Sequence, residues 1–150
     1  MNLESRDFVI RDRRDNDKET ILKIENSMPW VRAFSGELEY LKEHYDKTIL
    51  EEISNEDYYW IIERKNGESL GSLSLDIDSE SEAHIYIHPI ENADMSGFGS
   101  ELLDKAIRYL NREYGIETFF AGLWDEKDPS IPLFEEAGYE IEDGSIEISV

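Results

Sequence analysis

The sequence contains no cysteine, few basic residues and no long apolar run. The absence of cysteine excludes a disulfide framework, a thiolate metal site and a cysteine nucleophile. No apolar stretch approaches the roughly 20 residues that cross a bilayer, and the polar start MNLESRDF does not resemble a secretory signal. We therefore expect a single domain over residues 1–150, with its own apolar core, in the cytoplasm.

Basic residues are scarce relative to acidic ones. The chain has 15 lysines and arginines against 36 aspartates and glutamates, which gives a net charge of −21. This charge disfavours nucleic acid and anionic membranes as partners. Two interpretations remain open: the acidity solvates the protein in a salt-rich cytoplasm, where repulsion is screened, or it attracts a cationic substrate. The spread of acidic residues over the whole chain favours the first.

The most informative stretch runs from residue 82 to residue 115. It begins as an alternating strand, Glu82–His88, with Ala83, Ile85 and Ile87 on one face. The opposite face carries Glu82, His84, Tyr86 and His88. Pro89 ends the strand ladder because it has no N–H to donate.

A glycine-containing turn and a helix follow this strand. Ser96-Gly97-Phe98-Gly99-Ser100 opens the helix and Gly115 ends it. The apolar stripe at helical spacing consists of Phe98, Leu102, Leu103, Ala106, Ile107, Leu110 and Tyr114. Such a turn favours anion binding, because unpaired backbone N–H groups and the helix dipole point at the ligand. The glycines also fit an ordinary helix start, since neither the dinucleotide fingerprint nor the P-loop pattern is present.

The rest of the chain predicts short elements in a mixed order. We expect further strands at 8–11, 58–63, 70–77, 118–124, 139–142 and 146–148, and helices after 15–17, at 36–54 and from 128 to 137. Trp30, Arg32 and Phe34 are interpreted as core residues rather than the wall of an acceptor cleft. Asn66-Gly67 and Asp143-Gly144 are hairpin turns. The pattern predicts an α/β (α+β) fold with a mixed, mostly antiparallel sheet.

This order of elements and three local patterns resemble the GNAT superfamily of acyl-CoA-dependent N-acetyltransferases over nearly the whole chain. Residues 66–71, NGESLG, resemble the family's NGE-x-I-G hairpin. Residues 87–89 with 97–99 resemble its V-x-P … G-x-G acyl-CoA signature, and residues 130–139, SIPLFEEAGY, resemble its S-x-x-L-Y-E-K-x-G-F segment. The resemblance implies a GNAT-like sheet of about seven strands with helices on both faces, and acetyl-CoA as co-substrate.

The resemblance also implies roles for individual residues. The CoA pyrophosphate is expected on the backbone N–H groups of Ser96, Gly97, Phe98, Gly99 and Ser100, which requires these groups to be free of other partners. The backbone groups of Ile85 and Ile87 are expected at the pantetheine and the thioester carbonyl, where one N–H stabilises the oxyanion. Ser130 is expected near the CoA sulfur. Lys127, where the family often has asparagine, either contacts a CoA phosphate or is solvated.

Catalytic residues are less clearly indicated. Glu82 falls where the family often has a catalytic glutamate, so Glu82, Tyr86 and Ser130 are the candidate catalytic residues. The alternative is that the polar face of this strand is only solvated. Phe134 replaces the tyrosine that often protonates the leaving thiolate, and Asp94 replaces the usual glutamine or arginine before the signature glycines. No metal site is expected, because histidines four residues apart on a strand lie about 13 Å apart.

The sequence therefore predicts an enzyme that moves an acetyl group from acetyl-CoA to a primary amine, either a small cationic amine or a protein N-terminus. Direct attack is favoured over a covalent acyl-enzyme, because no cysteine is present. A catalytically silent GNAT-like module that binds CoA or a protein is the alternative, favoured by Asp94, the longer loop before Gly97, and Phe134. A homodimer that pairs through the edge of the closing hairpin is a third interpretation.

Overall fold

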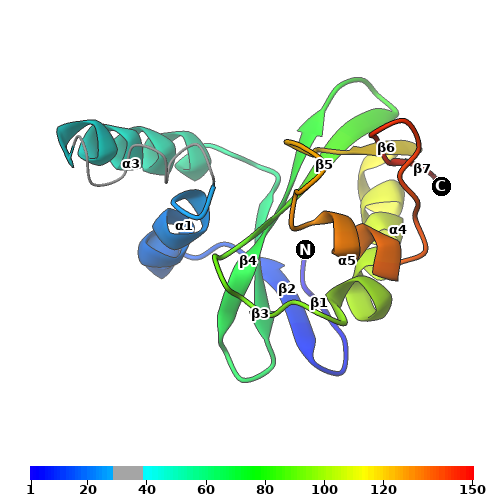
Figure 1. Ribbon diagram of the computed structural model, residues 1–150, viewed down its shortest axis with the longest axis horizontal. Helices are drawn as coiled ribbons and strands as arrows, with labels where there is room; N and C mark the ends of the chain where they lie inside the picture. Colours follow the sequence, from blue (N-terminus) through cyan, green and yellow to red (C-terminus); the bar gives the residue numbers. More distant parts are fainter. Residues whose placement is uncertain (29–38) are drawn as a thin grey trace.

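A seven-stranded sheet runs through the computed structural model, which describes residues 1–28 and 39–150 (Figure 1). The strands are β1 (Leu3–Glu4), β2 (Phe8–Asp12), β3 (Tyr59–Arg64), β4 (Ser69–Ile77), β5 (Glu82–Pro89), β6 (Thr118–Ala121) and β7 (Glu147–Ser149). They follow one another across the sheet in chain order. Every neighbouring pair is antiparallel except β5 and β6, which are parallel.

Helices cover both faces of this sheet (Figure 1). They are η1 (Asp15–Asp17), α1 (Lys18–Glu25), α3 (Glu39–Ser54), the π-helical segment η2 (Gly99–Leu103), α4 (Asp104–Tyr114) and α5 (Ile131–Glu136). The predicted mixed, mostly antiparallel fold class with helices on both faces is confirmed. No helix in the described residues is long and apolar enough to cross a membrane.

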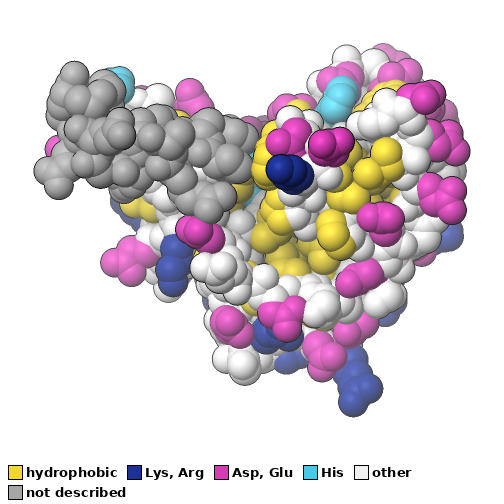
Figure 2. Space-filling view, in the orientation of Figure 1, with side chains coloured by type: hydrophobic (Ala, Val, Ile, Leu, Met, Phe, Trp, Pro, Cys, Tyr) yellow, Lys and Arg dark blue, Asp and Glu magenta, His cyan; other side chains and the backbone are white. Residues whose placement is uncertain are grey.

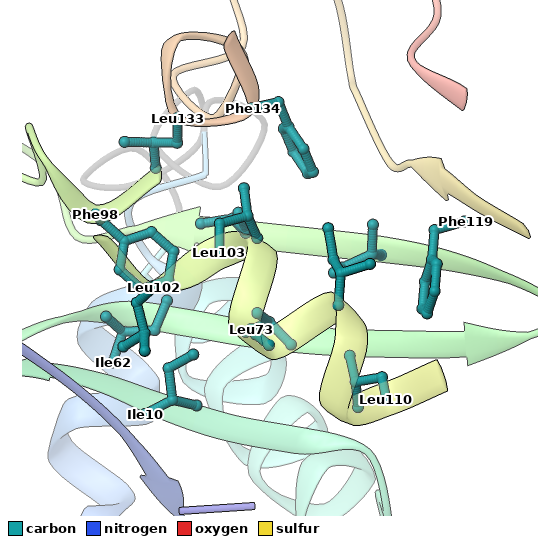
Figure 3. Close-up of a cluster of buried hydrophobic side chains, with 14 of the residues drawn as sticks. Ile10, Ile62, Leu73, Phe98, Leu102, Leu103, Leu110, Phe119, Leu133 and Phe134 are labelled. Carbon is teal, nitrogen blue, oxygen red and sulfur yellow. The ribbon is translucent and has the colours of Figure 1, made fainter. Parts of the chain in front are cut away.

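The larger apolar core lies between the sheet and the helices η2, α4 and α5 (Figure 3). Phe98, Leu102 and Leu103 face strand residues such as Leu73, while Leu133 and Phe134 of α5 pack on them from the other side. A smaller core lies on the opposite face, where α1 and α3 pack on β3. The alternation of side chains along each strand therefore supplies two cores from one sheet.

Strand β6 is shorter than the predicted strand at 118–124. Its last paired residue is Ala121, opposite Ile85 of β5. A Cβ at Gly122 would overlap the ring of Tyr86, and the N–H of Trp124 donates to the Asp128 carboxylate at 3.0 Å rather than to a strand. The chain thus leaves the sheet at Gly122, and β5 continues without its β6 neighbour.

The C-terminal end also differs from the predicted hairpin. Residues 139–142 form no strand, and only a bridge between Glu142 and Ser145 remains there. Strand β7 pairs with β6 instead, where Ile148 is buried in the core. The predicted tight turn is present, since Asp143 and Gly144 have φ of 52° and 78°. Strand β1 was not predicted, and Trp30, Arg32 and Phe34 lie outside the described residues.

Candidate active site

The edge of β5 opens where β6 ends. The carbonyl of Ile85 accepts a hydrogen bond from the N–H of Gly122 at 2.7 Å, so the backbone groups of Ile85 point at β6. Strand geometry repeats every two residues, which turns the N–H and C=O of Ile87 toward the same edge. Ile87 lies two residues beyond the last β5–β6 pair. Of the two residues predicted to offer backbone groups to a ligand, Ile87 lies on an edge that no strand of residues 1–28 and 39–150 covers. The carbonyl of Ile85 already accepts from Gly122.

A cavity of about 230 Å³ lies at this opening. Its lining comes from the end of β5, from the segment after β6 and from the chain just after α1: Ser27, Met28, Ile87, His88, Pro89, Trp124, Lys127, Asp128 and Pro129. The cavity therefore combines an apolar wall with a few polar groups, as ligand sites usually do. The predicted ligand contact Lys127 is among the lining residues.

His88, which follows Ile87 on β5, is one of the titratable residues that line the cavity. Burial lowers the pKa of its imidazole, and the nearby Asp128 carboxylate opposes that shift only in part. Its Nδ1 atom is buried and has no hydrogen-bond partner among the described residues. A neutral imidazole with an unpaired nitrogen can accept a proton. The sequence placed His88 on the correct strand face, but nothing in the alternation distinguished it from His84.

Of the two predicted catalytic residues on β5, Glu82 lies far from the opening and Tyr86 lies next to it, with its ring over Gly122. Glu82 is exposed at the first position of the strand, about 16 Å along the strand from Ile87 at the usual rise per residue. Tyr86 lies between them, 5.8 Å from the ring of His88 by centroid distance. Burial, followed by the nearby Asp76, raises the pKa of Tyr86, so its hydroxyl keeps its proton at neutral pH.

Ser130 has a structural partner in Asp128. The N–H and the hydroxyl of the fully buried Ser130 both donate to one Asp128 oxygen, at 2.8 and 2.7 Å. These bonds hold the chain just before α5, which begins at Ile131 rather than at the predicted residue 128. The hydroxyl proton of Ser130 is therefore directed at Asp128 and away from a reacting group.

The turn before η2 contains the N–H groups that the sequence assigned to an anion. Gly97 has a φ of 94°, which favours glycine. The N–H of Gly97 donates to both carboxylate oxygens of Glu136 at 3.2 and 3.1 Å, and the N–H of Gly99 donates to one of them at 3.1 Å. The N–H of Ser96 donates to the Asp94 carboxylate at 3.0 Å, and that of Phe98 to the carbonyl of Met95.

The expectation that these amides lack partners is therefore wrong for Ser96, Gly97, Phe98 and Gly99. The turn attracts negative charge as predicted, and the chain itself supplies that charge through Asp94 and Glu136. Hydrogen bonds from Ser96 hold the pKa of Asp94 below its usual value. Arg64, which the sequence reasoning missed, donates to the carbonyl of Asp94 from the β3–β4 hairpin. A contact between residues 30 apart in the chain leaves no local sequence signal.

Comparison with known proteins identifies the fold. A family profile described as "Acetyltransferase (GNAT) domain" matches residues 10–147. A GNAT-family acetyltransferase from Bacillus anthracis has a similar structure, with a TM-score of 0.72, 15% identity and coverage of 99% of this chain and 98% of that one. No curated protein matches the chain.

Two further solved structures are similar to this chain and contain a ligand. A ribosomal-protein α-N-acetyltransferase, RimL, solved with CoA, has a TM-score of 0.71 and 15% identity, with 100% of this chain and 98% of that one covered. Spermidine N-acetyltransferase from Vibrio cholerae, solved with CoA and spermine, has a TM-score of 0.64 and 17% identity, with 95% of each chain covered. At these identities the likeness of the structures shows the fold alone.

Proposed function

Because this chain belongs to the GNAT family of acetyltransferases, we propose that it moves an acetyl group from acetyl-CoA to a primary amine by direct attack. The observation that carries the proposal is the opening of β5 beyond Gly122. There the backbone of Ile87 and the neutral imidazole of His88 border one cavity. A backbone donor and a proton acceptor are the two groups that amine acetylation needs.

Ile87 supplies the donor in this proposal. In the reaction the amine nitrogen forms a bond to the thioester carbonyl carbon, and the carbonyl oxygen gains negative charge. A backbone N–H beside that oxygen stabilises the charge without moving. The carbon–sulfur bond then breaks and the thiolate leaves. Phe134, where the family often has a tyrosine, is fully buried and has no proton to give to the thiolate.

His88 takes the proton that the attacking amine must lose. Its lowered pKa keeps the imidazole neutral at physiological pH, and the residue lines the cavity together with Ile87. A general base placed in this way typically accelerates a reaction by about 10²–10⁴-fold. We prefer His88 over Glu82 as the base because Glu82 lies at the far end of the strand.

A cationic acceptor fits the surface around this cavity. A larger cavity of about 700 Å³ is lined by residues of α1, α3, the start of β4 and the loop after β5, among them Glu19, Asp46, Glu68 and Glu91 with Lys23. One hydrogen bond joins the walls of the two cavities, from the N–H of Glu91 to the Ser27 hydroxyl at 2.7 Å. On the face seen in Figure 2, acidic side chains are more widespread than lysines and arginines, and they surround an apolar area. Negative charge of this kind concentrates cationic amines near the site.

A catalytically silent CoA-binding or protein-interaction module is the second candidate. The occupied amides of Gly97 and Gly99 and the buried Phe134 favour it. Release of free thiol from acetyl-CoA separates the two functions, measured with a panel of polyamines, other small amines and peptides with free N-termini. We expect amine-dependent thiol release; CoA binding without release for any acceptor would support the silent module.

A further inference from the structure

Glu136 reaches the turn before η2 because α5 is packed tightly against it. A Cβ added at Gly99 would overlap the carbonyl oxygen of Leu133 and come within 2.8 Å of the Cβ of Glu136. Leu133 and Phe134 of the same helix pack beside Phe98 and Leu103 (Figure 3). The base of the Glu136 side chain is thus fixed beside the amides by backbone packing, and its carboxylate is within reach of them.

The Glu136 carboxylate makes the contacts that a phosphate oxygen makes at a helix start. One of its oxygens accepts from both Gly97 and Gly99, and the other accepts from Gly97. Hydrogen bonds from N–H groups to an anion are short and strong compared with neutral ones. The same two N–H groups cannot serve this carboxylate and a pyrophosphate together, and two anions at one turn also repel each other.

Two other carboxylates, those of Asp94 and Glu101, lie near the turn. Asp94 occupies the N–H of Ser96. Glu101 lies on the other side, where its carboxylate accepts from the Ser5 hydroxyl and the Asp7 N–H, both at 3.1 Å. These partners hold Glu101 in place, whereas the contacts of the exposed Glu136 carboxylate are to the turn itself. Unlike Glu101, Glu136 can therefore leave both glycine amides by rotating its side chain into solvent.

We propose that Glu136 is an internal competitor for the pyrophosphate of acetyl-CoA and thereby sets the affinity of the protein for its co-substrate. The inference rests on the proposed function, since it assumes that acetyl-CoA uses this turn. Binding of the co-substrate requires the Glu136 carboxylate to give up both glycine amides. Part of the binding free energy is consumed in that exchange, so the affinity is lower than the turn alone would provide.

Calorimetric titration with CoA tests this proposal in two matched variants, Glu136→Ala and Glu135→Ala. Both remove one negative charge from an exposed position of α5, but only Glu136 contacts the turn through its side chain. We expect Glu136→Ala to bind CoA at least about tenfold more tightly than Glu135→Ala, the range expected for hydrogen bonds to a charged group. Glu136→Gln, which keeps the side-chain size, is expected to fall between them.

The amide signals of Gly97 and Gly99 give a second readout by ¹⁵N NMR. Inorganic pyrophosphate should shift both signals in Glu136→Ala at concentrations that leave them unchanged in Glu135→Ala. Equal CoA affinity and equal shifts in the two variants would overturn the inference and leave the proposed function standing. Failure of every folded variant to bind CoA would also overturn it, and amine-dependent thiol release then decides separately whether the proposed function survives.

Discussion

At Ile87 and at Gly97 the chain presents the same chemical group, a backbone N–H, in two different states. Ile87 lies on a strand edge that the end of β6 has left open, whereas Gly97 lies in a turn whose N–H is held by a carboxylate. The strand edge presents one donor next to one acceptor, so it has little net preference for charge. The turn gathers donors at a helix start, and in a chain with 36 acidic residues it finds an anion within the molecule.

Occupied amides do not by themselves exclude a ligand at the turn. The N–H groups of Gly97 and Gly99 were expected to be free, and they are not. The occupants of Gly97 and Gly99 are side-chain oxygens of an exposed residue, which a stronger anion can replace without unfolding any backbone. The family assignment, which covers residues 10–147, does not depend on these amides. Occupation of these two amides by Glu136 is therefore expected to weaken CoA binding at the turn rather than to prevent it.

The largest effect is expected at the open end of the site. His88→Gln should lower turnover by about 100-fold or more, because the proton acceptor beside Ile87 is removed. Glu82→Gln is the matched control on the same strand face, and we expect its turnover to stay near that of the wild type. Steady-state thiol release measures both. A greater loss of turnover in Glu82→Gln than in His88→Gln would identify Glu82 as the general base.

The pH profile gives His88 a second, independent readout. Burial lowers the pKa of the imidazole below its ordinary value of about 6.5, so the base is neutral above that lowered pKa and protonated below it. In the wild type, turnover should fall as pH drops through this lowered pKa, and that acidic limb should be absent in His88→Gln. The same acidic limb in both proteins would assign the proton transfer to another group.

The effect expected at the occupied end is on folding rather than on chemistry. Gly99→Ala places a methyl group against the backbone of Leu133, which should lower the free energy of unfolding by about 3 kcal/mol, as overpacking of a tight contact does. Gly122→Ala is the counterpart at the open end, where the new methyl meets the ring of Tyr86. A side chain can move aside more easily than a backbone, so we expect a smaller loss there in urea unfolding.

The smallest effect is expected at Ser130. This residue lies between Asp128 of the cavity lining and helix α5, which carries Glu136. Ser130→Ala removes one hydrogen bond to Asp128 and should destabilise the fold by about 1 kcal/mol. Turnover per folded molecule should be nearly unchanged, because the hydroxyl proton is directed at Asp128. A large loss of turnover with little loss of stability would restore the catalytic role predicted from the sequence.

Local patterns in the sequence predicted the elements that local chemistry determines. Alternation identified β5, Asn66-Gly67 marked the hairpin with Gly67 at a φ of 93°, and Gly115 ends α4 at a φ of 70°. The carboxylate of Asp128 accepts from the N–H of Ser130 just before α5. At the Gly67 turn, the end of α4 and the Asp128 turn the hydrogen bonds join residues a few positions apart, whereas the signal for β5, which pairs with β4 and β6, was the alternation of its side chains.

The predictions that were wrong concern features that depend on contacts between residues far apart in the chain. Residues 139–142 alternate like a strand, yet Tyr139 is held by its hydroxyl, which donates to Asp104 of α4 at 2.9 Å. The early end of β6 depends on Tyr86, which lies over Gly122. The contact between Glu136 and Gly97 joins residues 39 apart. No periodicity or motif encodes such a pairing, so the state of the turn amides had to come from the structure.

A crystal structure with bound CoA tests the central claim most directly. We predict that the CoA sulfur lies in the cavity beside Ile87 and His88. The pyrophosphate should lie on the N–H groups of Gly97 and Gly99, with the Glu136 side chain turned into solvent. CoA bound elsewhere, with Glu136 still on both glycine amides, would contradict it.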